Sequence, residues 1–138
     1  MTLQEKNKEV AHRWLDEVWN QGLQRTIDEL FHEDGLAYGF PEPNSVLSHQ
    51  QFKDVVRQFQ GAFSDIHVVA DDMIAEDDRL AMRYTARMTH TGDDLGIPAT
   101  GTRVIFSGGG ILHMRDGRIM QAWNMVNTHH ITQQLQTV

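Results

Sequence analysis

The sequence predicts a single α+β domain in which a strongly curved antiparallel sheet folds over helices and leaves a cone-shaped cavity. Two amphipathic helical segments come early, at 2–20 and 48–63, and four long strand-like segments then follow one another up to Asn127. Helices followed by a run of sequential strands are typical of α+β folds in which the helices gather on one side of the sheet. At 138 residues the chain, 1–138, fits one domain with a sizeable core.

The first helix is expected at 2–20. Thr2, followed three residues later by Glu5, forms a capping box. Apolar side chains then recur at helical spacing, namely Val10, Ala11, Trp14, Leu15 and Val18. Gly22 suits the position just past a helix end, because glycine adopts the left-handed conformation without strain. A second, short helix is expected at 26–31 and a short strand at 36–40.

A third helix is expected to begin at Ser48, which forms another capping box with Gln51. Its apolar stripe consists of Phe52, Val55, Val56, Phe59, Ala62 and Phe63. Strand patterns follow at 66–76 and 79–91, with a tight turn between them and a loop after the second.

The most informative stretch is 101–127, where two strand-like runs flank Asp116-Gly117. Three consecutive glycines, 108–110, interrupt the first run, although glycine in a strand loses packing and chain entropy. Two interpretations stay open. Either a bound ligand occupies the space above the glycines, or the sheet bulges or bends there.

The hairpin loop decides which residues share a face. A two-residue loop would pair His113 with Met120, whereas a three-residue loop, 115–117, pairs Met114 with Arg118. We expect the three-residue loop, because it places the even-numbered residues of both strands together. This face consists of Val104, Phe106, Gly108, Gly110, Leu112, Met120, Ala122, Asn124 and Val126. One amide and two glycines on an otherwise apolar face are typical of a ligand pocket.

The opposite face of this hairpin is too apolar to be left in water. It carries Ile105, Ile111, Ile119, Trp123 and Met125. We therefore expect a homodimer in which two sheets pack through this outer face.

Composition excludes several classes of function. The formal net charge of −7 and the absence of a basic patch argue against nucleic acid as a partner. The chain has no cysteine, so it has no disulfides, thiol nucleophiles or thiolate metal sites. No apolar run reaches the roughly 18 residues of a membrane span, and no signal peptide is visible, so we expect a cytoplasmic protein.

A series of short motifs resembles SnoaL-like polyketide cyclases, a family of the nuclear transport factor 2-like (cystatin-like α+β barrel) superfamily. The motifs occur in the family's order along nearly the whole chain, at 19–22, 27–34, 63–65, 89–92, 96–101, 116–119 and 133–135. The resemblance implies a small dimeric enzyme that needs no cofactor or metal. It also implies a small apolar or aromatic substrate, since characterised members close the last ring of an aromatic polyketide by intramolecular aldol condensation.

At three positions the chain departs from this family. The acid/base aspartate of the last strand falls at Asn124, and a glutamine and a histidine that members can carry fall at Gly108 and Gly110. An amide cannot take a proton at pH 7. Three readings therefore stay open: aldol cyclisation or a related enolisation, a non-catalytic binding module, and a hydrolase or isomerase that uses the same pocket.

The candidate catalytic residues are Asn124 and His32, which follows the second helix where the family often has a histidine at the pocket mouth. The candidate pocket residues are Trp14, Trp19, Tyr38, Val56, Phe59, Phe106, Gly108, Gly110, Leu112 and Ala122. His90 is interpreted as stabilising the loop after it. His129-His130 lacks a third ligand at useful spacing, so no metal site is expected.

Overall fold

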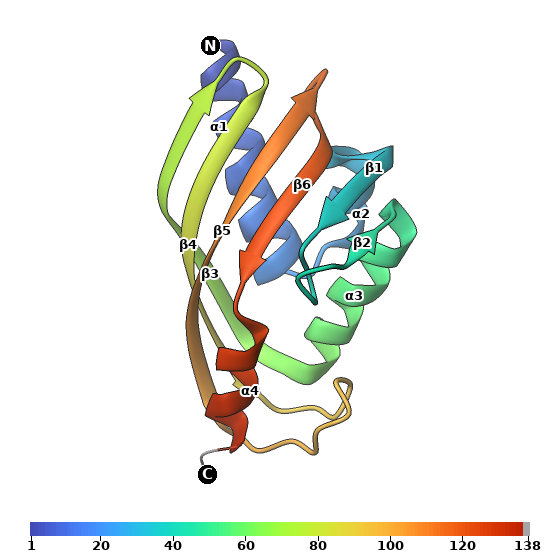
Figure 1. Ribbon diagram of the computed structural model, residues 1–138, viewed down its shortest axis with the longest axis vertical. Coiled ribbons are helices and arrows are strands. Elements are labelled where there is room, and N and C mark those ends of the chain that lie inside the picture. The colour runs from blue at the N-terminus through green and yellow to red at the C-terminus, as the bar shows by residue number, and fades with distance from the viewer. Residues whose placement is uncertain (137–138) are drawn as a thin grey trace.

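The computed structural model describes residues 1–136 and shows a curved six-stranded sheet folded over helices (Figure 1). The elements in chain order are α1 (Leu3–Arg13), a π-helix η1 (Trp14–Asn20), α2 (Gln24–Leu30), β1 (Phe31–Tyr38), β2 (Val46–Leu47), α3 (His49–Ala62), β3 (Phe63–Glu76), β4 (Arg79–His90), β5 (Arg103–Arg115), β6 (Arg118–Val126) and α4 (Thr128–Gln136). The strand order is β2-β1-β6-β5-β4-β3. The predicted α+β architecture is confirmed.

The first helix begins as predicted but changes its winding halfway. The Thr2 hydroxyl accepts a hydrogen bond from the Glu5 amide at 3.1 Å. From Trp14 to Asn20 the helix widens into a π-helix, which is rare and frequently found at functional sites. At its end the Asn20 side-chain amide donates to the Val68 carbonyl at 3.2 Å and accepts from the Val68 amide at 2.6 Å. This double hydrogen bond fixes η1 to β3.

Helix α3 has the predicted capping box, in which the Gln51 amide donates to the Ser48 hydroxyl at 3.3 Å and the Ser48 amide donates to Gln51 Oε1 at 2.9 Å. Its buried stripe consists of Phe52, Val56, Phe59 and Ala62. The helix ends one residue earlier than predicted, because Phe63 already belongs to β3 and pairs with His90.

An aromatic cluster joins these helices to the sheet. The ring of Phe31 is fully buried and lies 5.8 Å from Trp14 and 5.6 Å from Phe52, centroid to centroid. Phe31 opens β1, so the prediction that it ends the second helix is wrong. Strand β1 is longer than the predicted strand at 36–40 and runs parallel to β6. Gly35 lies under this ring, since a Cβ there would overlap the Phe31 ring.

The β5–β6 turn corrects the predicted register. Arg115 pairs with Arg118, so the loop is the two-residue Asp116-Gly117, and both residues have positive φ as a type I′ turn requires. The predicted three-residue loop is wrong. A bulge directly after the turn leaves Met120 without a partner in β5, because His113 already pairs with Gln121.

Beyond the bulge, even-numbered residues of β5 pair with even-numbered residues of β6, as predicted. Leu112 pairs with Ala122, and Gly110 pairs with Asn124. The inner face is therefore the predicted one beyond the bulge. Close to the turn it differs, because Ile119 pairs with Met114 and is fully buried on the inner face rather than on the outer one.

Helix α4 packs against the lower part of the sheet in Figure 1 through the buried Ile131 and Leu135. The Gln134 side-chain amide donates to the Ile105 carbonyl at 2.8 Å, and Gln134 Oε1 accepts from the Ile105 amide at 3.0 Å. This contact continues the hydrogen bonding of β5 beyond the end of β6. Within residues 1–136 no helix combines the length and the apolar character needed to cross a membrane.

Candidate functional site

A cavity lies between the inner face of the sheet and the helices η1 and α3. The empty space between its lining side chains is about 550 Å³, and part of that space is open solvent. Apart from two polar groups its lining is apolar or aromatic. The lining residues are Trp14, Leu15, Trp19, Phe40, Phe59, Val68, Met82, Tyr84, Ala86, Met88, Phe106, Asn124 and Val126.

Trp19 is the centre of the aromatic wall. Its ring meets Phe40, Phe52 and Phe59 edge to face at centroid distances of 5.9, 6.2 and 5.9 Å. Edge-to-face packing suits the charge distribution of aromatic rings. From α3 the Gln60 side-chain amide donates to the Trp19 carbonyl at 2.9 Å. The π-helix thus presents an indole ring that is held from several sides.

Asn124 lines the cavity from β6. Its Nδ2 donates a hydrogen bond to the Tyr38 carbonyl at 3.2 Å. The chain turns sharply at Gly39, which has a φ of +82°. Gly39 also packs directly against Asn124, since a Cβ at Gly39 would overlap the Asn124 backbone carbonyl. Within residues 1–136 no donor lies within hydrogen-bond distance of Asn124 Oδ1, which leaves this oxygen as an acceptor.

Tyr84 is the second polar residue of the lining, and the sequence analysis missed it. Tyr84 on β4 pairs with Gly108 on β5. A Cβ on Gly108 would lie 2.5 Å from the Tyr84 hydroxyl oxygen and 2.6 Å from Cζ. The tyrosine ring therefore fills the space above Gly108. Of the two interpretations left open by the sequence, a bound ligand and a bulge or bend of the sheet, neither is needed to explain this glycine. The β4–β5 register was needed to find this contact, and the sequence gives no direct signal for it.

Burial raises the pKa of Tyr84 to about 12. Its hydroxyl is therefore protonated at neutral pH and can donate a hydrogen bond. Among the described residues that line the cavity, Tyr84 is the one titratable side chain; no carboxylate or imidazole is among them. Residues 1–136 also contain no group of three side chains placed to hold a metal ion.

Five of the residues predicted for the site line this cavity: Trp14, Trp19, Phe59, Phe106 and Asn124. The other predicted pocket residues do not. Gly108 is covered by Tyr84, and Gly110 is buried beneath Met82, whose Cε would lie 3.9 Å from a Cβ at that glycine.

Three more positions belong to the packed core beside the cavity: Val56, Leu112 and Ala122. Tyr38 instead lies on the outer face, stacked on Trp123 at 5.2 Å. Successive strand residues face opposite sides of the sheet, and its neighbour Ala37 takes the inner position.

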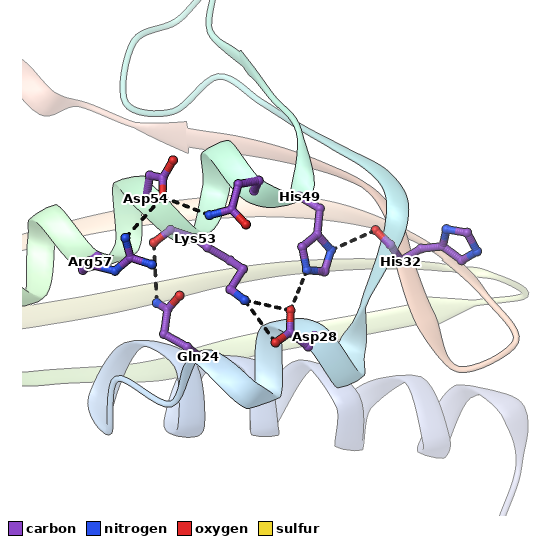
Figure 2. A network of polar contacts seen from close by, with 8 residues as sticks. Gln24, Asp28, His32, His49, Lys53, Asp54 and Arg57 are labelled. Atoms are coloured by element: carbon purple, nitrogen blue, oxygen red, sulfur yellow. Dashed lines mark hydrogen bonds and ion pairs between the residues drawn. The ribbon is translucent and has the colours of Figure 1, made fainter.

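His32 does not line the cavity either. It lies on β1, where its Nδ1 accepts a hydrogen bond from the Asp34 amide at 3.0 Å. Figure 2 shows its ring turned away from the polar network next to it. In that network His49 and Lys53 of α3 both contact Asp28 of α2 at 2.9 Å, and His49 Nδ1 lies 3.2 Å from the His32 carbonyl. The hydrogen bonds from His49 and then Lys53 lower the pKa of Asp28.

His90 is fully buried and holds the loop that follows it, as the sequence indicated. Its Nδ1 accepts from the Thr100 amide at 3.3 Å and lies 3.1 Å from the Thr100 hydroxyl. His113 lies on the outer face, where its ring is 4.7 Å from that of Trp123. Neither imidazole contributes to the cavity.

Comparison with known proteins places the chain among relatives of one fold. The model of the SnoaL-like polyketide cyclase family matches residues 9–135. No curated protein matches the sequence.

Several solved structures superpose on nearly the whole chain. TsrD from Streptomyces laurentii is 22% identical, with a TM-score of 0.84 and 100% of both chains covered. A candidate SnoaL-like polyketide cyclase from Jannaschia sp. CCS1 is 16% identical, with a TM-score of 0.88, covering 100% of this chain and 96% of the other. An LEH-like epoxide hydrolase from M. tuberculosis is 15% identical, with a TM-score of 0.75, covering 98% and 88%. At these identities the likeness shows the fold alone.

Proposed function

This chain belongs to the SnoaL-like polyketide cyclase family, and from that premise we propose that its cavity binds a small, flat, apolar carbonyl compound. The observation that carries this proposal is the aromatic cavity, in which the described lining residues with polar side chains, besides the indoles of Trp14 and Trp19, are Asn124 and Tyr84. A flat polycyclic ligand would bury apolar surface against Trp14 and Trp19, at about 25 cal/mol per Å². The two polar groups would fix its orientation.

The lining favours binding over acid–base catalysis. An aldol closure needs a base close to the α-carbon of the substrate and donors at the developing enolate. Asn124 cannot be that base, and Tyr84 stays protonated at neutral pH. A hydrolase or isomerase would need a base in the same way. Aldol cyclisation or a related enolisation is the second candidate, supported by Asn124, which lines the cavity where the family's aspartate falls.

We expect 1-hydroxyanthraquinone to quench the tryptophan fluorescence of this protein saturably. Two of the three tryptophans, Trp14 and Trp19, line the cavity, whereas Trp123 lies on the outer face. A fluorescence titration of the Trp123→Phe variant should therefore give the same dissociation constant as the wild type, and Trp19→Phe should lose much of the quenching. Quenching that is linear in ligand concentration, or that disappears only in Trp123→Phe, would contradict binding in the cavity.

We further propose that the protein forms a homodimer through the outer sheet face. Large apolar side chains are exposed there on three strands: Val69, Ile74, Ile105, Ile111 and Met125. The stacked rings of Tyr38 and Trp123 lie on the same face and extend it onto β1. Exposed apolar side chains gathered on one face are typical of interfaces, and a second copy offers a surface of matching composition.

Trp123→Arg should shift the protein to monomer at concentrations where the wild type is a dimer. The substitution would place an unpaired charge in a desolvated interface, which is strongly unfavourable. Sedimentation velocity across a concentration series measures the shift. Leu3→Arg is the matched control, because it adds the same charge to an exposed apolar position on α1, outside the sheet. A wild type that is monomeric at tens of micromolar would refute the dimer.

A further inference from the structure

We propose that the Tyr84 hydroxyl donates a hydrogen bond to the carbonyl oxygen of the bound ligand, and that Tyr84 thereby selects aromatic ketones over hydrocarbons of the same shape. This inference rests on the proposed function, since it identifies the polar contact within that same cavity. It adds a residue that is absent from the candidate site indicated by the sequence.

The first support is the position of the hydroxyl. Tyr84 belongs to β4, but its ring leans across the neighbouring strand, because the hydroxyl oxygen lies only 2.5 Å from where a Gly108 Cβ would be. The hydroxyl is therefore above β5 rather than above its own strand. The glycine makes this possible, since any other residue at position 108 would push the ring away.

The second support is the other polar group of the lining. Asn124 of β6 lines the same cavity as Tyr84, and within residues 1–136 its Oδ1 accepts no hydrogen bond. A ligand in the cavity can therefore meet a donor at Tyr84 and an amide at Asn124, and two polar contacts fix its orientation.

The third support is the chemistry of the hydroxyl. Within residues 1–136 it has no hydrogen-bond partner, although it is half-buried in an apolar lining. A ligand that covers the hydroxyl takes it out of water, which is unfavourable unless the ligand supplies an acceptor. A ketone oxygen is such an acceptor, whereas a hydrocarbon is not. The hydroxyl remains a donor up to high pH, because burial raises the pKa of Tyr84 to about 12.

The test compares 9-fluorenone with fluorene, which has the same ring system without the carbonyl group. Dissociation constants are measured by tryptophan fluorescence for the wild type and for Tyr84→Phe. The preference is the dissociation constant of fluorene divided by that of fluorenone. This ratio should be about three- to tenfold larger in the wild type than in Tyr84→Phe, as expected for one buried neutral hydrogen bond. Tyr38→Phe is the matched control, since it removes the other tyrosine hydroxyl of the chain, on the outer face, and should keep the wild-type preference.

Infrared difference spectra of bound fluorenone provide a readout that a structural role of Tyr84 would not change. The carbonyl stretch should lie at lower frequency in the wild type than in Tyr84→Phe, because a hydrogen bond weakens the C=O bond. In Gly108→Ala the added Cβ should displace the Tyr84 ring, so the carbonyl stretch of bound fluorenone should lie at higher frequency than in the wild type, as in Tyr84→Phe.

The outcomes separate this inference from the proposed function. If the wild type binds neither probe, the proposed function fails and the inference fails with it. If the wild type binds both probes but Tyr84→Phe leaves the preference and the carbonyl frequency unchanged, the cavity binds ligands and the role of Tyr84 is refuted.

Discussion

Asn124→Asp should raise the rate of intramolecular aldol cyclisation of an anthraquinone-type methyl ester by about 10²-fold or more, which is the usual contribution of a general acid–base group. The substitution is nearly isosteric, so packing around β6 should change little. A carboxylate among apolar and aromatic side chains has its pKa raised by desolvation, which brings it closer to the neutral pH at which a general base works best.

The higher cyclisation rate of Asn124→Asp would come from a carboxylate that acts first as a base and then as an acid. The new carboxylate takes the proton from the carbon between the ester and the aromatic system. The resulting carbanion attacks the ketone carbon, a carbon–carbon bond forms, and the ketone oxygen becomes an alkoxide. The protonated carboxyl group then returns the proton to that oxygen. In the wild type the first step lacks its base, because a neutral amide accepts no proton at pH 7.

Product formation by chromatography measures this effect, with Asn124→Ala as the control that removes the amide without adding a base. Efficient cyclisation by the wild type that survives in Asn124→Ala would show that the base lies elsewhere. His32→Ala would then be the variant to assay, since His32 is the other acid–base candidate that the sequence offered.

Phe31→Ala should lower the free energy of unfolding by about 3–5 kcal/mol, as large-to-small substitutions of buried aromatic residues do. Phe31 is fully buried and contacts Trp14, Phe52 and His49 through its ring. Gly35 cannot fill the space, because it has no side chain. Urea unfolding followed by circular dichroism measures the loss.

Phe31→Leu is the matched variant, because it keeps an apolar side chain and should lose less stability than alanine does. A loss below about 1 kcal/mol in Phe31→Ala would mean that the aromatic cluster collapses into the space and that Phe31 is not the link between helices and sheet. Such a result would also weaken the view that Trp14 is held rigidly at the cavity.

Much of the fold could be predicted from local patterns. The capping boxes at Thr2 and Ser48 located two helix starts, and alternating apolar residues located β3 to β6. Strand β1 was predicted only in part, because its pairing with β6 is parallel and joins segments far apart in the sequence. The π-helix has no simple periodic signal, since its stripe resembles that of an ordinary α-helix.

The residues of the candidate site were harder to predict, because they depend on pairing between strands. The inner face of β5 and β6 was predicted correctly beyond the bulge for an incorrect reason, because a bulge at Met120 compensated for the wrong loop length. Tyr84 was missed, since its place over Gly108 depends on the pairing of β4 with β5. His32 was chosen from the resemblance, whereas the curvature of the sheet decides which side chains reach the cavity.

The side-chain amides of Asn20 and Gln134 occupy backbone groups at two edges of this sheet. Strand β3 ends the strand order, and β5 extends past the end of β6, so both would offer unpaired backbone groups to another chain. Asn20 engages the amide and carbonyl of Val68, and Gln134 engages those of Ile105, so an incoming strand finds these positions taken. Deamidation of either side chain would remove its donor and leave the Val68 or Ile105 carbonyl without a partner, so slow chemical ageing at two amides would expose an acceptor on the strand to pairing with another chain.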